Sequence, residues 1–299
     1  MTESLDAVRL TFSPTGVVVL QCVLAVVILG VSLELSFSDF RKLMREPKPV
    51  FAGLLSQLVV LPLLTFGLVV VMNPHPSLAL GLMLVAACPG GNMSNVLTHW
   101  SGGRTAVSMS LTALSGLISP ITTPLTFQAL GSLHPATQAA MRQVSVPFNE
   151  LLMTIVVALV IPLMIGMTIA EKRPELARRL HKPLSRLGVG ALVVFIILAA
   201  ASNFGTFMAA LGTIFVLVFL HNLLALGAGF GMATVFRVGE RERRAITFEN
   251  GVHNTTLGLV LIFTYFQELG GMALIAAFWS SWHFATGVPL AIYWSKRRA

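Results

Sequence analysis

A single carboxylate, Glu249, lies in the stretch FENGVHNTT at residues 248–256, between a basic segment and an apolar one. An ionised carboxylate near the bilayer centre costs ~2.5–3.5 kcal/mol on insertion scales, so it should face protein, water or an ion. Alternatively, Glu249 extends the basic segment, because it follows Arg244 by five residues, about 7.5 Å along a helix. Its polar, oxygen-bearing neighbours favour an ion site over a further loop charge.

Other oxygen-bearing side chains lie in segments that are otherwise apolar. Hard cations prefer such oxygen ligands, and broken helices add free carbonyls, so one carboxylate among neutral oxygens suits a monovalent cation. A hydroxyl can instead bond back to its own helix, and an amide can link two helices. The candidate ligands besides Glu249 are Ser94, Asn95, Ser108, Thr112 and Gln57, with Ser108 and Thr112 four apart and so on one face.

Three histidines also lie in apolar segments. His253 follows Glu249 by four residues, His283 lies in WSSWHFATG, and His221 lies in FLHNLLALG. A membrane histidine is most often an interhelical hydrogen-bond partner, which is our interpretation of His221. The sequence contains no HExxH, no GxSxG and no Cys/His zinc spacing. It therefore does not indicate an enzyme.

The composition indicates a polytopic membrane protein. The chain has 299 residues, of which 55% are hydrophobic and 11% charged, with a mean hydropathy of +0.83. Apolar runs long enough to span a bilayer recur along it. We predict an all-α fold with nine transmembrane helices in a single transporter domain over residues 1–299. The predicted helices are 16–35, 50–72, 78–100, 106–131, 147–170, 187–203, 206–235, 245–266 and 271–294.

The basic residues predict the orientation. Eighteen of the 20 Lys and Arg residues fall in alternate loops, whereas Arg9 and Arg142 fall on the other side. By the positive-inside rule, the N-terminus lies outside and the C-terminus in the cytoplasm. Orientation explains the charge of +8 better than a nucleic-acid partner does, although basic loops can also attract anionic lipid. Cys22 and Cys88 fall in predicted spans and indicate no disulfide framework.

Two predicted helices are interrupted by glycine and polar residues. The interruptions are CPGGNMSN at residues 88–95 and ENGVHN at 249–254. They lie in halves of the chain that EKRPELARRLHKPLSR, residues 171–186, separates as an expected interfacial linker. Two broken helices of opposite sense, one per half, indicate an inverted-repeat transporter with its site near the midplane. The helix N-termini that restart there favour an anionic or strongly polar solute.

With these motifs the sequence resembles the bile acid:sodium symporter family. The resemblance rests on ACPGGNMSNVLTHWSGGRTAVSMSLTALSGLISPITTPL, ENGVHNTTLGL and SDFRKLMREPKPVFAGLLSQLVVLP, and it extends over almost the whole chain. It implies a panel domain and a core domain, with two broken helices crossing in the core. It also implies transport of organic anions, bile acids among them, with sodium. The predicted nine-helix form is similar to that of the animal transporters.

The resemblance also implies roles for individual residues. His253 stands where the family often has a glutamine, so the second sodium site could bind sodium weakly or give way to a proton. Asn92 stands where threonine is common. The first sodium site would use Ser94, Asn95, Ser108, Thr112 and Glu249; the second Gln57, Glu249, His253 and the carbonyls of Asn250 and Val252; and the substrate site Asn92, Asn254, Thr255 and His283.

The sequence thus predicts a secondary active transporter in the plasma (inner) membrane. It would import a small organic anion, bile-acid-like or a small carboxylate, with one or two sodium ions by alternating access. The expected partners are this anion, sodium and the lipid bilayer, with no nucleic acid and no obligatory protein partner. The alternatives are a proton-coupled transporter or exporter on the same fold, and a membrane sensor that binds the solute without transporting it.

Overall fold

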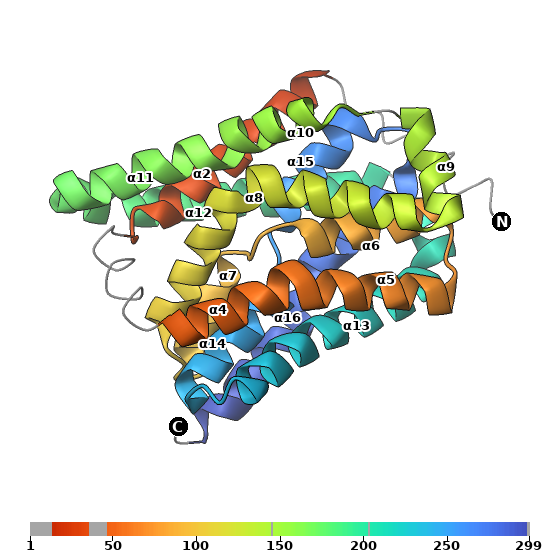
Figure 1. Cartoon of the computed structure of the whole chain (residues 1–299). Coiled ribbons are helices and arrows are strands. Elements are labelled where there is room, and N and C mark those ends of the chain that lie inside the picture. Colours follow the sequence, from red (N-terminus) through yellow and green to blue (C-terminus); the bar gives the residue numbers. More distant parts are fainter. Residues whose placement is uncertain (1–13, 36–46, 145, 203, 298–299) are drawn as a thin grey trace.

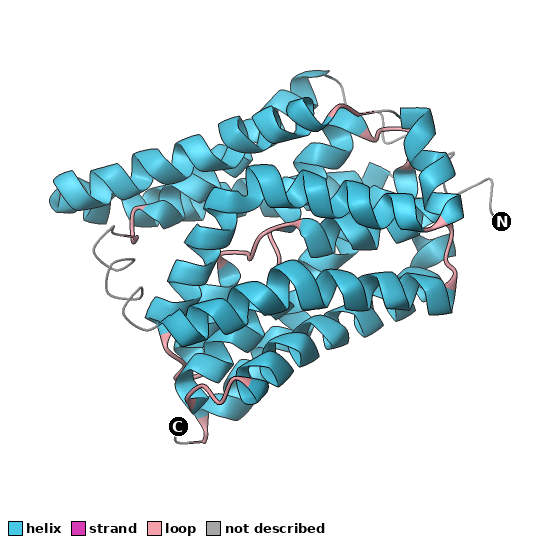
Figure 2. Cartoon of the chain, in the orientation of Figure 1, coloured by secondary structure: helices cyan, strands magenta, loops and turns pink. Residues whose placement is uncertain are grey.

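A computed structural model describes residues 14–35, 47–144, 146–202 and 204–297 of the chain. In these residues the regular structure is helical, apart from one isolated antiparallel β-bridge, as Figures 1 and 2 show. The all-α prediction is therefore confirmed. The basic residues Arg9, Arg41, Lys42, Arg45 and Arg298, on which part of the predicted orientation depends, lie outside the described residues.

The helices follow one another closely along the chain. Their bounds are α2 Pro14–Ser32, α4 Pro47–Leu55, η1 Ser56–Val60, α5 Leu61–Met72, α6 Pro76–Ala87, α7 Met93–Trp100, α8 Thr105–Leu133, α9 Pro135–Val144, α10 Phe148–Ile155, η2 Val156–Val160, α11 Ile161–Lys172, α12 Pro174–Ser202, α13 Phe204–Val235, α14 Glu240–Gly251, α15 Thr255–Tyr265 and α16 Gly270–Ser295. Five of them (α2, α4, α6, α9 and α12) begin at proline, whose fixed φ and missing N–H suit the first helical position.

Two long helices each contain one π-helical stretch. Helices α4 and α5 are continuous through η1, and α10 and α11 are continuous through η2. Pro62 and Pro162 each follow two residues after the π-helical stretch. A proline inside a helix removes one hydrogen bond and clashes with the preceding turn. The wider π-helical turn accommodates that clash without ending the helix.

Four segments differ from the sequence-based prediction. Residues 174–186, expected as part of an interfacial linker, form the first half of α12. Pro174 begins this helix and Glu175 lies in its first turn, which is favourable for a helix N-terminus. The short helix α9 was not predicted. The breaks are also shorter than expected, because α7 already begins at Met93 and α14 continues to Gly251.

The interior of the bundle is formed by short apolar helices. In α6 every residue from Ser77 to Ala87 is buried, and in α15 every residue from Thr255 to Phe263 is buried. Apolar side chains on the outer helices are exposed instead, among them Leu63 and Val71 on α5 and Ile165 on α11. Helices that are apolar all round lie inside a bundle, and an exposed apolar face on the outer helices suits contact with lipid.

Four helices of the described residues are long and apolar enough to cross a membrane. They are Pro47–Met72, Thr105–Leu133, Phe148–Lys172 and Leu211–Val235. Shorter apolar helices occur at Val18–Ser32, Pro76–Ala87 and Thr255–Tyr265. The number of membrane crossings stays a prediction.

The helices form two groups. Helices α2, α11 and α12 pack against one another and lie along the upper side of Figure 1. Helices α6, α7, α8, α13, α14 and α16 form the larger group below them, in which α13 packs on α14, and α16 packs on α6. The loop segments between α6 and α7 and between α14 and α15 lie inside the bundle, as Figure 2 shows. The same order, an unbroken helix, a broken helix and a long helix, occurs once in each half of the chain.

Candidate functional site

The two breaks, between α6 and α7 and between α14 and α15, meet as antiparallel extended segments. An isolated antiparallel β-bridge joins them. The Gly91 amide donates to the Val252 carbonyl at 2.7 Å, and the Asn254 amide donates to the Pro89 carbonyl at 2.9 Å. Backbone groups that leave the helical hydrogen-bond pattern need other partners when buried. Here each break supplies partners for the other, which explains how both persist in an apolar interior.

Two glycines permit this close approach. A Cβ atom built on Gly91 would lie 2.7 Å from the His253 carbonyl oxygen, and one built on Gly90 would lie 1.9 Å from Oε1 of Glu249. Neither distance is compatible with a real Cβ atom. Gly91 therefore lets the two backbones touch, and Gly90 leaves room for the carboxylate.

Glu249, in the last turn of α14, is 1% exposed and is surrounded by hydroxyl groups. Its Oε2 accepts hydrogen bonds from Ser94 Oγ at 2.6 Å, Ser108 Oγ at 3.0 Å and Thr112 Oγ1 at 3.0 Å. Thr112 Oγ1 also lies 2.8 Å from Oε1 of Glu249 and 3.4 Å from Oδ1 of Asn95. The structure thus brings together all five residues predicted for the first ion site, from helices α7, α8 and α14.

Within the described residues, the ion pairs of the structure do not include Glu249. The nearest arginine along the chain, Arg244, pairs with Glu240 on its own helix. Three hydroxyls can stabilise a carboxylate by hydrogen bonding, but they do not neutralise its charge. A buried charge without a counter-charge is costly, so this arrangement suits a bound cation.

The residues predicted for a second ion site are also buried. Both amide atoms of Gln57 and Oδ1 of Asn250 make no hydrogen bond within the described residues. Nδ1 of His253 lies 3.0 Å from the Cys88 carbonyl. Because a carbonyl can only accept, Nδ1 carries a proton, and Nε2, which has no partner in the described residues, presents a lone pair in the neutral ring. The Val252 carbonyl already accepts from Gly91.

A small cavity lies between the two helix groups, beside the crossing. Two of the predicted substrate residues, Asn92 and Asn254, line it together with Pro89, Gly90 and Thr112. Its other wall is mostly apolar and consists of Ile28, Val31, Ser32 and Leu35 with Leu159 and Leu163. The cavity therefore combines two amides with an apolar surface that suits a carbon skeleton.

The other two predicted substrate residues do not line this cavity. Thr255 is buried and accepts a hydrogen bond from Ser280 Oγ at 2.6 Å. His283 is buried beside Trp279 and Phe284, with ring centroids 5.9 Å and 4.4 Å away. Neither of its ring nitrogens makes a hydrogen bond within the described residues.

Comparison with known proteins identifies the family of the chain. Residues 21–210 match the model of the Sodium Bile acid symporter family. This range includes one of the two breaks and all three hydroxyl residues that bond to Glu249. The chain belongs to this family. The sodium bile acid symporter family comprises transporters, so the chain is a membrane transporter with sodium as its coupling ion, and not an enzyme, as the sequence predicted.

Relatives of this symporter occur in bacteria, plants and animals. The chain is 31% identical over 275 residues to the uncharacterized sodium-dependent transporter YocS of Bacillus subtilis, an alignment that covers 92% of this chain and 82% of the relative. It is 31% identical over 276 residues to the probable sodium/metabolite cotransporter BASS2, chloroplastic, of Oryza sativa, covering 86% and 62%. It is 26% identical over 239 residues to the ileal sodium/bile acid cotransporter of Oryctolagus cuniculus, covering 80% and 67%.

The structure of this symporter adds polar residues that the sequence did not single out. Trp279 Nε1 donates to Nδ1 of His221 at 2.9 Å, and His221 Nε2 lies 2.8 Å from Thr65 Oγ1. His221 is thus an interhelical hydrogen-bond partner, as predicted. His253 makes an edge-to-face contact with the same indole, with its ring centroid 5.5 Å from that of Trp279. Ser115, which accepts from the Gly90 amide at 3.3 Å, follows Ser108 and Thr112 on α8, and that periodicity could have identified it.

Proposed function

We propose that the chain couples the import of a small organic anion to sodium entry by alternating access. The observation that carries the proposal is the Glu249 carboxylate, which is 1% exposed and bonded by hydroxyls at 2.6–3.0 Å. A sodium ion beside this carboxylate would balance its charge. Hard monovalent cations suit this set of one carboxylate, three hydroxyls and one amide oxygen.

The first sodium ion would bind between three helices. Each hydroxyl that donates its proton to Glu249 keeps oxygen lone pairs for a cation. Ser94 and Asn95 come from α7, and Ser108 and Thr112 from α8. An ion held in this way would link both sides of the crossing through Glu249 on α14.

A second ion would bind on the other side of Glu249, with Gln57, His253 and the carbonyls of Asn250 and Val252 as its ligands. The amide atoms of Gln57, which make no hydrogen bond within the described part of the chain, support a ligand there. Imidazole nitrogen is a poorer sodium ligand than amide oxygen. The proposal therefore gives the first site the stronger sodium binding and leaves the number of ions per cycle at one or two.

The substrate would bind in the cavity beside the crossing. The amides of Asn92 and Asn254 would donate to its carboxylate, and the apolar wall from α2, η2 and α11 would contact its carbon skeleton. A bile-acid-like molecule and a small carboxylate both have this chemistry. Since Thr255 and His283 lie outside the cavity lining, the proposal assigns direct contact to the two asparagines.

Transport would move one helix group against the other. The cavity lies between α2, η2 and α11 on one side and the crossing on the other, so a relative movement of the two groups would open it to either side in turn. We assign the first group to a panel domain and the second to a core domain. The chain would lie in the plasma membrane. The distribution of Lys and Arg supports an N-terminus outside the cell and a C-terminus in the cytoplasm.

Uptake into liposomes that contain the purified protein tests this function. An inward sodium gradient should drive accumulation of an organic anion that an equal potassium gradient does not drive, and the substrate should be recovered chemically unchanged. Sodium-linked binding without accumulation would point to a sensor and contradict the proposal. A panel of labelled carboxylates, from small hydroxy acids to bile acids, would identify the substrate.

Proton coupling is a second candidate, because Nε2 of His253, which has no hydrogen-bond partner among the described residues, can accept a proton. His253 lies four residues after Glu249, in the extended segment that follows α14. Accumulation driven by an inward proton gradient without sodium would support it over the sodium symporter.

A further inference from the structure

Among the described residues, Arg244 and Glu249 are the buried side chains of the types Asp, Glu, Lys and Arg. Both lie on α14, five residues apart. The proposed function uses Glu249 and gives Arg244 no role. Arg244 is 2% exposed, so protein groups must take the place of the water molecules that its guanidinium would otherwise bind.

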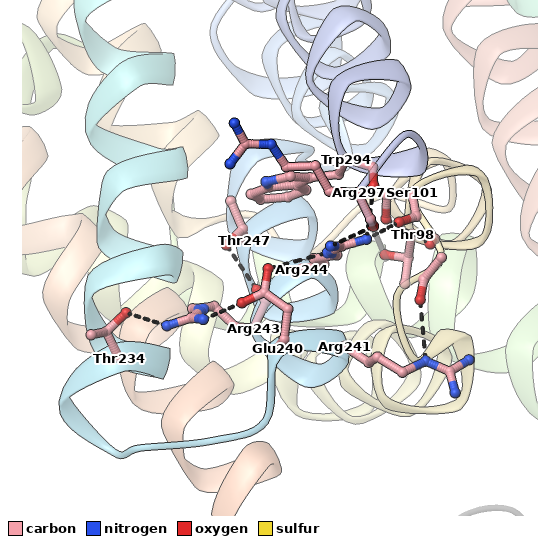
Figure 3. A network of polar contacts seen from close by, with 11 residues as sticks. Thr98, Ser101, Thr234, Glu240, Arg241, Arg243, Arg244, Thr247, Trp294 and Arg297 are labelled. Atoms are coloured by element: carbon pink, nitrogen blue, oxygen red, sulfur yellow. Dashed lines mark hydrogen bonds and ion pairs between the residues drawn. The ribbon is translucent and has the colours of Figure 1, made fainter. Parts of the chain in front are cut away.

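The guanidinium of Arg244 contacts the ends of two other helices, as Figure 3 shows. Nη1 donates to the carbonyl of Ser101 and, at 3.0 Å, to that of Trp294, and Nη2 donates to the carbonyl of Arg297 at 3.2 Å. Nε lies 3.2 Å from Oε1 of Glu240, one turn earlier on α14. One side chain thus joins the C-terminal ends of α7 and α16 to the first turns of α14.

The chemistry of these groups explains why an arginine is needed. The last carbonyls of a helix lack intrahelical partners and carry the negative end of the helix dipole. A guanidinium presents five N–H donors in a rigid, planar fork, so it can satisfy carbonyls from two helices at once. An ammonium group at the same place would match the charge but not the directions of these bonds.

Two of these three helices, α7 and α14, also carry residues of the proposed ion site. Helix α7 has Ser101 as its C-cap and Ser94 in its first turn, and α14 carries both Arg244 and Glu249. The Trp294 ring lies 5.8 Å from the Arg244 guanidinium carbon and 5.3 Å from the Phe248 ring. Phe248 directly precedes Glu249 in the chain. Packing therefore connects the arginine to the residue that must place the carboxylate against Ser94.

We propose that Arg244 is a positioning residue for the ion site: it fixes α14 against the ends of α7 and α16, so that Glu249 meets the Ser94 hydroxyl. This inference rests on the proposed function of the Glu249 cluster. The turn after α7 supports the same contact, because the Arg104 amide donates to the Arg241 carbonyl at 2.9 Å and Arg241 Nε donates to the Gly102 carbonyl at 3.2 Å.

Arg243 provides a matched control. It precedes Arg244 on the same helix and also pairs with Glu240, but its other hydrogen bond goes to Thr234 on α13. Among the residues drawn in Figure 3, no dashed line joins the Arg243 side chain to the ends of α7 or α16. Loss of the positive charge at Arg243 therefore changes the local charge as loss of the charge at Arg244 does, but it does not remove the contacts with the ends of α7 and α16.

The test compares Arg244→Lys, Arg244→Met and Arg243→Met in the purified full-length protein. The first readout is the sodium concentration that gives half of the sodium-induced rise in melting temperature. We expect Arg244→Lys to raise it about tenfold, the effect of losing about one charge-assisted hydrogen bond in the bound state, and Arg243→Met to leave it unchanged. If Arg244→Met does not fold, Arg244→Lys still tests the proposal.

A double-mutant cycle separates positioning from general destabilisation. If Arg244 acts through the contact between Glu249 and Ser94, the effects of Arg244→Lys and Ser94→Ala on this sodium concentration will be less than multiplicative when combined. A wild-type sodium requirement in Arg244→Lys, or a purely multiplicative double variant, would overturn the proposal.

A second readout does not depend on sodium. A hydrophobic carbodiimide modifies buried protonated carboxyl groups, and mass spectrometry of the peptide that contains Glu249 gives the rate. We expect faster labelling in Arg244→Lys than in wild type or Arg243→Met, measured in potassium, because the carboxyl group loses its fixed hydroxyl partners. Equal rates would refute the positioning role. If sodium had no effect on wild type, the proposed ion site would fail, while the labelling rates would still test Arg244.

Discussion

Replacement of Glu249 by glutamine is the sharpest perturbation of the proposed ion site. Glutamine keeps the size of the side chain and removes its charge. The three hydroxyls that now donate to the carboxylate can rotate to accept from the new amide group, so the fold should be retained. At a sodium concentration of 100 times Kd, bound sodium stabilises the wild type by about 2.7 kcal/mol, equivalent to about 5–10 °C in melting temperature.

The assay is thermal unfolding of the detergent-purified protein in sodium, lithium and potassium at constant ionic strength. We expect a sodium-specific rise in the wild type, no such rise in Glu249→Gln, and similar melting temperatures of the two proteins in potassium. Glu268→Gln, at an exposed carboxylate, is the control and should keep the rise. A sodium-specific rise that survives in Glu249→Gln would refute the reasoning, because the buried charge would then have no part in cation binding.

Three further predictions concern residues around this site. Gly90→Ala should abolish the sodium-induced rise, because its Cβ would lie 1.9 Å from Oε1 of Glu249; Gly67→Ala, with no atom within 4 Å, should keep it. His253→Gln should strengthen sodium binding at the second site, measured as a higher Hill coefficient for sodium-driven uptake, and an unchanged coefficient would contradict this. Partial burial opposes ionisation of Glu240, but hydrogen bonds from Arg243 and Arg244 outweigh it and lower its pKa. The wild type should therefore be more stable than Glu240→Gln above the ordinary glutamate pKa, and this difference should disappear as the pH falls through the lowered pKa. Thermal unfolding measures it, and a difference that does not depend on pH would contradict a contribution of these ion pairs to stability.

Much of the arrangement around Glu249 could be predicted from the sequence because local rules determine it. Ser108 and Thr112 share a helix face by their spacing, and both do face Glu249. Pro89, with the two glycines after it, predicts a helix break, and α6 ends at Ala87. The meeting of α7, α8 and α14 at one carboxylate is a tertiary contact. The resemblance to a known family predicted it, whereas spacing alone left each hydroxyl free to bond to its own helix.

The failures have equally physical causes. The charges of residues 174–186 and the two prolines among them are typical of a loop. However, Pro174 begins α12 and Pro183 lies inside it, and exposed charges are compatible with a helix. The sequence pattern places Arg244 in a basic loop with Arg241 and Arg243. No local sequence pattern distinguishes an exposed loop arginine from one that donates to the carbonyls of distant helix ends. Its burial follows from residues 101 and 294–297, which lie far from it in the sequence.

The position of Thr112 gives a reason why ion and substrate binding should be coupled. Thr112 donates to Glu249 at 2.8 Å and also lines the cavity between the helix groups, as does Gly90, against which the carboxylate packs. A cation that orders Glu249 therefore also fixes one wall of the proposed substrate site, before any substrate arrives. Coupling between two sites is reciprocal in binding free energy, so substrate that contacts this wall must strengthen sodium binding by the same factor. The shared wall consists of a hydroxyl and a glycine backbone, and not of a flexible side chain. Binding at one site can therefore change the affinity of the other without a large rearrangement.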